Sequence, residues 1–167
     1  MDNNYIFQYW EAIQDGTVTV GKWIKTIYEI LVNGLKSGKW DFDEEKANKA
    51  INFIENFCHH SEGRNDLLKL ELWQKAIVSA IFGIMDKRTG YRQFREVFIV
   101  VARKNGKTLF AAAIAAYMAY IDGEYGAKVY FLAPKLDQAD LVYDAFYQIV
   151  QADDELDSIT KKRRGDI

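Results

Sequence analysis

The chain has 167 residues, of which 49% are hydrophobic and 28% charged, a composition typical of a folded globular protein with a sizeable core. Its formal net charge of −2 argues neither for nor against nucleic-acid binding. Its one cysteine, Cys58, excludes an intramolecular disulfide and suits a reducing compartment. The first residues lack the basic segment of a signal peptide, and the longest apolar run, 109–121, is shorter than the roughly 18 residues of a membrane span. We therefore expect a soluble intracellular protein with no membrane partner.

Residues 1–60 are predicted to form a helical N-terminal segment. An aromatic-rich helix ends at Asp15-Gly16, and a second helix follows to Leu35. Acidic residues in 41–45 then suit the start of a third helix, which we favour over a metal site. The apolar residues of the second helix recur at helical spacing and predict one buried stripe: Val20, Trp23, Ile24, Ile27, Ile30, Leu31 and Leu35.

The Cys58-His59-His60 sequence is a possible metal site. Adjacent ligands rarely converge on one ion, and the chain holds no other cysteine or histidine to complete a set of four. We interpret these residues as a helix end. Residues 61–66 form a polar connector, and a further amphipathic helix is predicted over 67–82.

Gln74 lies within this helix, about thirty residues before the sequence Gly106-Lys107-Thr108. Its amide group could pair with the donor–acceptor edge of adenine, or it could be an ordinary surface glutamine, and spacing alone does not decide. Basic residues gather in the loop 85–95 and in the tail 161–164. They are candidate DNA contacts, although such clusters are more often solvated faces: Lys87, Arg88, Arg92, Arg95 and Lys161 to Arg164.

The most informative stretch is 98–108, an apolar run followed by a polar loop and an Ala-rich helix. Gly106 allows close backbone approach to phosphate, Lys107 supplies a cation, and the Thr108 hydroxyl can ligate Mg²⁺. This order predicts a nucleotide-phosphate cradle. The usual motif has a first glycine five residues before Gly106, where Val101 stands. An ordinary polar turn before a helix is therefore the alternative.

A second strand is predicted over 127–133, ended by Pro134, with a helix over 137–150. Strand, phosphate loop, helix, strand and helix form a right-handed βαβ unit of a parallel sheet. The predicted fold class is α/β, a partial P-loop NTPase with a parallel sheet of the ASCE type, preceded by the helical segment. The predicted domains are 1–60 and 67–167.

With these motifs, the chain resembles the large terminase subunit of tailed bacteriophages, in the HK97-like branch. Residues 103–108 resemble the deviant Walker A motif of that branch, in which the first glycine is commonly absent. Upstream, Leu72-Trp73-Gln74 with 81–83 resembles the adenine-recognising Q motif. Residues 122–127 and 133–139 resemble the family's second strand and the helix after it.

The resemblance implies an ATP-driven motor that moves double-stranded DNA into a procapsid, with ATP and Mg²⁺ as cofactors. It implies catalytic roles for Lys107 and Arg103, and Mg²⁺ ligation by Thr108. The nucleotide-binding residues that it implies are Gln74, Arg103, Lys104, Asn105, Gly106, Lys107 and Thr108. Arg103 matches an arginine of the family that touches the γ-phosphate and could stabilise charge in phosphoryl transfer.

The resemblance also implies partners and a location. In the family a nuclease domain follows the ATPase domain, and subunits form a ring on the portal protein while a small terminase subunit recognises DNA. The protein is expected in the host cell cytoplasm, transiently on the procapsid and not in the mature virion.

Two elements of the family's pattern are missing from this sequence. No apolar strand ending in Asp-Glu follows Lys107, so the Walker B motif is absent, and the nuclease domain is absent too. We expect this chain to bind nucleotide but to hydrolyse little of it, because no Asp anchors Mg²⁺ and no Glu orients water. The alternatives are the first half of a helicase-like P-loop nucleic-acid ATPase and a non-catalytic interaction module.

Overall fold

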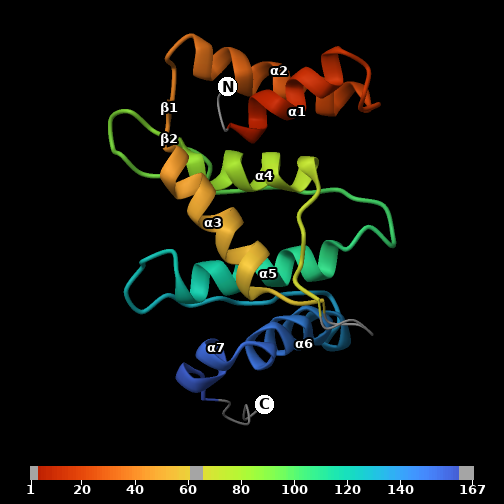
Figure 1. Cartoon of the computed structure of the whole chain (residues 1–167), viewed down its shortest axis with the longest axis vertical. Coiled ribbons are helices and arrows are strands. Elements are labelled where there is room, and N and C mark those ends of the chain that lie inside the picture. The colour runs from red at the N-terminus through yellow and green to blue at the C-terminus, as the bar shows by residue number, and fades with distance from the viewer. Residues whose placement is uncertain (1–3, 61–65, 162–167) are drawn as a thin grey trace. The chain divides into compact units, whose positions relative to one another are not determined.

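The computed structural model describes residues 4–60 and 66–161. These residues divide into two units: the first comprises 1–52 and 70–99, and the second comprises 53–69 and 100–167. The predicted domain boundary between 60 and 67 stays a prediction. The elements of the described residues, labelled in Figure 1, are α1 (Tyr5–Gln14), α2 (Lys22–Lys36), β1 (Asp41–Phe42), α3 (Glu44–Phe57), α4 (Leu72–Gly83), β2 (Ile84–Met85), α5 (Lys107–Tyr120), α6 (Leu136–Ala152) and α7 (Asp154–Ile159).

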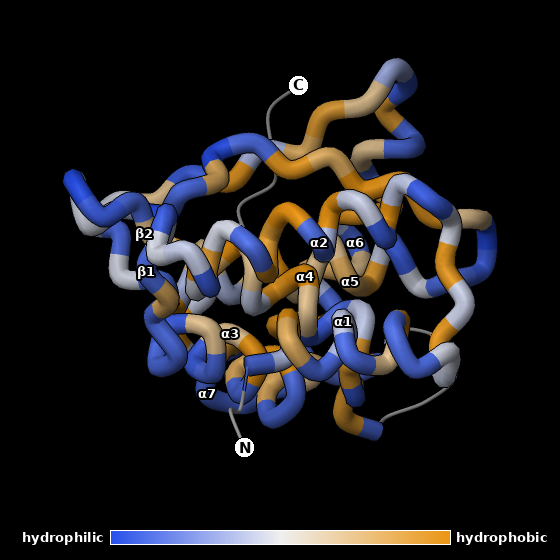
Figure 2. Tube along the Cα trace, turned by 90° about the horizontal axis from the view of Figure 1, so that it is seen from above, coloured by the Kyte–Doolittle hydropathy of each residue, from blue (hydrophilic) through white to orange (hydrophobic). Residues whose placement is uncertain are grey.

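The core of the first unit lies where α1 packs against α2 and α4. Asn4 begins α1, and its side-chain oxygen accepts a hydrogen bond from the Ile6 N–H at 2.9 Å. The rings of Tyr9 and Tyr28 meet edge to face, with centroids 4.7 Å apart. Burial, followed by the nearby Tyr9, raises the pKa of Tyr28 above its ordinary value, so its phenol stays neutral. Figure 2 shows α4 as a mostly apolar stretch of this unit.

The predicted buried stripe of α2 is only partly correct. The buried residues are Tyr28, Leu31, Val32 and Gly34, whereas Trp23 is 71% exposed and Ile30 is 54% exposed. The apolar residues of α2 cover more of the helix circumference than the neighbouring elements of this unit cover. Periodicity therefore predicted the helix correctly but not which part of its apolar surface is buried.

The connection from α2 to α3 confirms the helix-start interpretation of the acidic residues. Asp43 precedes α3, and its carboxylate accepts a hydrogen bond from the Lys46 N–H at 2.9 Å. β1 pairs with β2 in antiparallel register, Asp41 opposite Met85. Gly83 lies against this pair, where a Cβ atom would come within 2.6 Å of the Phe42 ring, so the close approach requires glycine.

The second unit is built on α5, which packs against α6. Both faces of α5 bury residues, mostly alanines, as predicted from its apolar sequence: Phe110, Ala112, Ala113, Ala115, Ala116 and Tyr117. α7 was not predicted. Asp153 caps it by accepting from the Glu155 and Leu156 N–H groups, and the hydroxyls of Tyr120 and Thr160 meet at 2.7 Å. None of the helices described is long and apolar enough to cross a membrane.

The prediction of a parallel sheet is wrong for the described residues, because their only sheet is the two-stranded antiparallel pair of the first unit. Residues 98–101 and 127–133 form no strand, and Phe98 is 93% exposed. Residues 127–132 still alternate between half-buried and exposed, with Phe131 packed on Phe146 of α6 at 6.0 Å between ring centroids. The residue pattern of a strand is present, but no neighbouring strand among the described residues completes a hydrogen-bonded ladder.

The difference between the two faces of α2 can be tested by a pair of substitutions. Leu31→Ala should lower the free energy of unfolding by about 2–5 kcal/mol, because it empties a buried site. Ile30→Ala is the matched control, with an expected cost of about 0.5 kcal/mol or less, because its side chain is already exposed. Urea denaturation followed by tryptophan fluorescence measures both, and an equal loss in the two variants would contradict the burial described.

Candidate functional site

The predicted phosphate loop lies in the second unit and leads directly into α5. A turn occurs at Arg103 and Lys104, and α5 begins at Lys107. Gly106 precedes the helix in the left-handed conformation, with φ 64°. Lys104 also has a positive φ, 66°, as the only residue other than glycine with this conformation in the described part of the chain. Two residues of the loop therefore have left-handed backbone conformations directly before α5.

The first turn of α5 presents unused hydrogen-bond donors. The N–H groups of Lys107, Thr108 and Leu109 form no hydrogen bond within the described residues, whereas the Phe110 N–H donates to the Gly106 carbonyl at 2.9 Å. Such N–H groups point along the positive end of the helix dipole, where an anion is stabilised. Nothing lies within 4 Å of the position that a Cβ atom would take on Gly106, so the space beside this residue is open.

The side chains of the loop add three cations and a hydroxyl group. Arg103, Lys104 and Lys107 are exposed and form no ion pair with any residue that the structure describes. Thr108 is half-buried in the first turn of α5. The loop thus combines backbone donors, three unpaired positive charges and one potential Mg²⁺ ligand, and a polyphosphate is bound by groups of these kinds.

Gln74 has a structural role that motif comparison did not show. It is buried in α4, and its side-chain oxygen accepts a hydrogen bond from the Glu71 N–H at 2.8 Å. The Glu71 side chain accepts in return from the Gln74 N–H, which completes a capping box. The Glu-x-x-Gln spacing could have predicted it. Gln74 belongs to the first unit and the phosphate loop to the second, so the structure groups 103–108 but does not place Gln74 with them.

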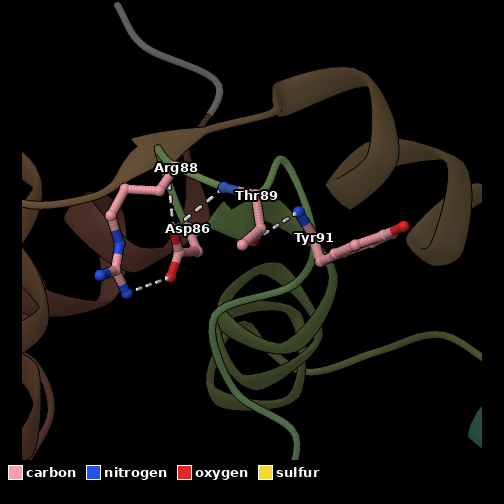
Figure 3. A network of polar contacts seen from close by, with 4 residues as sticks. All are labelled: Asp86, Arg88, Thr89 and Tyr91. Carbon is pink, nitrogen blue, oxygen red and sulfur yellow. Dashed lines mark hydrogen bonds and ion pairs between the residues drawn. The ribbon is translucent and has the colours of Figure 1, made fainter.

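The basic loop after β2 is organised by Asp86, as Figure 3 shows. Its carboxylate accepts from the Arg88 N–H at 2.7 Å and the Thr89 N–H at 3.2 Å, and the first of these hydrogen bonds is the main cause of its lowered pKa. The Arg88 guanidinium lies 3.4 Å from the same carboxylate, and Lys87 lies 3.4 Å from Asp41.

The remaining candidate DNA contacts differ in their surroundings. Arg92 lies 5.4 Å from the centroid of the Phe82 ring, so it too has an intramolecular partner, whereas Arg95 is exposed. Of the tail, Lys161 is exposed, and 162–164 lie outside the described residues. DNA contact by these cations stays a prediction.

Cys58 follows the end of α3 and is fully buried. Burial, and secondly the negative charge of Asp153, raises the pKa of its thiol from 9.0 to about 12. A neutral buried thiol is a poor metal ligand and a poor nucleophile. A search of the described residues found no group of three or more His, Cys, Asp or Glu side chains that could hold a metal ion.

Comparison with known proteins places these observations in a family. Residues 72–167 match the family described as the terminase large subunit, ATPase domain. The crystal structure of the HK97 bacteriophage large terminase is similar to this chain, with a TM-score of 0.61, 25% sequence identity and coverage of 72% of this chain. The chain spans 24% of the length of that terminase chain. The search of curated proteins found no match.

The structural similarity to this terminase supports an α/β fold of the P-loop type for the chain. The particular family follows from the matched residues, which include the whole phosphate loop and make up more than half of the chain. This chain belongs to the family of terminase large subunit ATPase domains.

The burial of Cys58 predicts a pH-dependent stability. Because the thiol pKa is raised in the folded state, its contribution is complete below about pH 9 and is lost as the pH rises towards 12. We expect urea denaturation to show a larger loss of stability between pH 8 and pH 10 for the unchanged chain than for Cys58→Ala. In the native chain at pH 8, a thiol reagent should label Cys58 only after urea is added, and equal pH dependence in both chains would contradict the prediction.

Proposed function

We propose that this chain is the ATP-binding part of a phage DNA-packaging motor, with the phosphate loop 103–108 as its nucleotide site. The observation that carries the proposal is the start of α5: three unused N–H donors and three unpaired cations lie close in sequence to a left-handed glycine. They lie within the residues that match the terminase ATPase family. A polyphosphate is the ligand whose charge and acceptor oxygens suit this arrangement.

The roles within the loop follow from the chemistry of each residue. The backbone at 104–106 surrounds the phosphates, and the Lys107 ammonium binds the β- and γ-phosphates. The Thr108 hydroxyl ligates Mg²⁺, which would supply further positive charge to the phosphates when bound. Arg103 stabilises the charge that develops on the γ-phosphoryl group during transfer.

Gln74 is proposed to recognise the adenine base. Its side-chain oxygen already accepts one hydrogen bond from Glu71, but an amide oxygen has a second lone pair and the amide nitrogen has two hydrogens. The capping box therefore fixes the orientation of the side chain without using all of its hydrogen-bonding groups. A base with a neighbouring donor and acceptor, such as adenine, can still pair with it.

The wider activity is proposed from the family. The complete motor would hydrolyse ATP to move double-stranded DNA into a procapsid, as a ring of identical subunits on the portal protein, with a small terminase subunit and a nuclease domain. It would act in the host cytoplasm and on the procapsid, and would be absent from the mature virion. Residues 1–167 by themselves are proposed to bind ATP but to turn it over slowly, because no apolar segment that ends in Asp-Glu lies between Thr108 and Ile167.

Nucleotide binding tests the proposal directly. Lys107→Ala should weaken the binding of MgATP to this chain by about tenfold or more, because it removes a charge-assisted contact to phosphate. Lys135→Ala is the matched control, since Lys135 is an exposed lysine that precedes another helix of the same unit, α6. Calorimetric titration measures both variants. If the Lys107→Ala variant bound MgATP as tightly as the unchanged chain, the proposed site would be contradicted. Rapid ATP turnover by the unchanged chain that Lys107→Ala abolishes would contradict the proposed slow hydrolysis.

Base recognition needs a separate pair of variants. Gln74→Ala and Glu71→Ala both break the capping box, so both are expected to cost about 1 kcal/mol of stability. Only Gln74→Ala removes the amide, and it should reduce the preference for ATP over GTP by about tenfold. Competition binding with the two nucleotides measures the preference. The same loss of preference in both variants would assign Gln74 to capping alone.

A further inference from the structure

The Asn105 side chain turns inward to the loop that carries it. Its amide nitrogen donates one hydrogen bond to the Ala102 carbonyl at 3.3 Å and another to the Arg103 carbonyl at 3.2 Å. We infer that Asn105 is a positioning residue, whose amide holds the phosphate loop in its binding shape without contacting the nucleotide. The inference rests on the proposed function of this loop, and it assigns to one side chain the task of shaping it.

The backbone of Lys104 adopts a conformation that needs support from its surroundings. A side chain with a Cβ atom disfavours positive φ, yet Lys104 has φ 66°. A conformation of this kind persists only where surrounding contacts hold it. The two hydrogen bonds of Asn105 span this residue, because they join the residue after Lys104 to the two carbonyls before it.

The two carbonyl groups before Lys104 accept hydrogen bonds from the Asn105 amide. A carbonyl oxygen that faced the phosphates would repel them, whereas N–H groups attract them. The amide of Asn105 binds the carbonyls of Ala102 and Arg103, so these acceptors are engaged on its side of the turn. Both hydrogens of the amide nitrogen serve these two bonds, which leaves that nitrogen with no donor for a nucleotide.

The first glycine of the usual phosphate-loop motif is replaced by a β-branched residue in this chain. The usual phosphate loop begins with a glycine that gives the chain freedom to turn, and Val101 stands at that position here. The turn lies instead at Arg103 and Lys104, next to the two hydrogen bonds of the Asn105 amide, which we call the Asn105 clamp. Gly106 then supplies the second left-handed position, with φ 64°. The clamp of Asn105 therefore supplies a constraint where this loop lacks its first glycine.

The test is a double-mutant cycle in this chain, with MgATP and inorganic pyrophosphate as probes. Asn105→Ala should weaken the binding of both by about tenfold, since it removes two hydrogen bonds that order the loop. Lys104→Gly accepts positive φ without strain, so adding it to Asn105→Ala should restore most of the loss. Lys104→Ala removes the same charge but keeps a Cβ atom, and it should restore nothing.

The outcomes separate this inference from the alternatives. Undiminished binding by Asn105→Ala would overturn it. Equal binding by the two double variants, Asn105→Ala with Lys104→Gly and Asn105→Ala with Lys104→Ala, would overturn it too, because backbone freedom at residue 104 would then not replace the amide of Asn105. If the unchanged chain binds neither probe, the proposed function fails, and backbone ¹⁵N relaxation of the ligand-free chain still tests the clamp. Faster motion at 103–106 in the Asn105→Ala variant, reversed by Lys104→Gly, supports it, and unchanged motion overturns it.

Discussion

The burial of α5 is the constraint on which the second unit depends. Its alanines have no side chain beyond Cβ, so neighbouring elements can approach closely and the helix is covered on most of its surface. The phosphate loop is attached to the first residue of this helix. One end of an exposed loop is thereby anchored to the best-packed part of the unit, and the direction of its unused N–H groups is set by the helix axis.

The helices could be predicted from the sequence because each has local signals. Glycines and acidic caps mark the limits of α1 to α3, and the apolar sequence of α5 indicates a buried helix. α7 was missed because its cap, Asp153, lies in a charged stretch that resembles a solvated tail. The strand predictions were wrong for a different reason. An apolar run shows that a segment can be covered, but a strand also requires a partner, which no local pattern can supply.

The residues assigned to the candidate site come from the sequence and stay a prediction, whereas the internal arrangement of the loop comes only from the structure. The Gly-Lys-Thr sequence identifies Gly106, Lys107 and Thr108 by residue type and order, and the family comparison covers all three. Residue type does not show that the Asn105 amide faces backward or that Lys104 has positive φ. Gln74 shows a different limit, because one glutamine matches both the adenine motif and the Glu-x-x-Gln spacing of a capping box, and the structure shows that the capping box forms.

The segment 127–132 has a consequence for handling the protein. One side of it packs through Phe131 on α6, while Tyr130 and Leu132 are exposed, and no strand among the described residues pairs with its backbone. An open edge of this kind is a template for adding a strand from another molecule. Intermolecular β-pairing should therefore limit the solubility of the isolated chain. Charged residues in place of Tyr130 and Leu132 would raise the solubility and leave the packing of Phe131 unchanged.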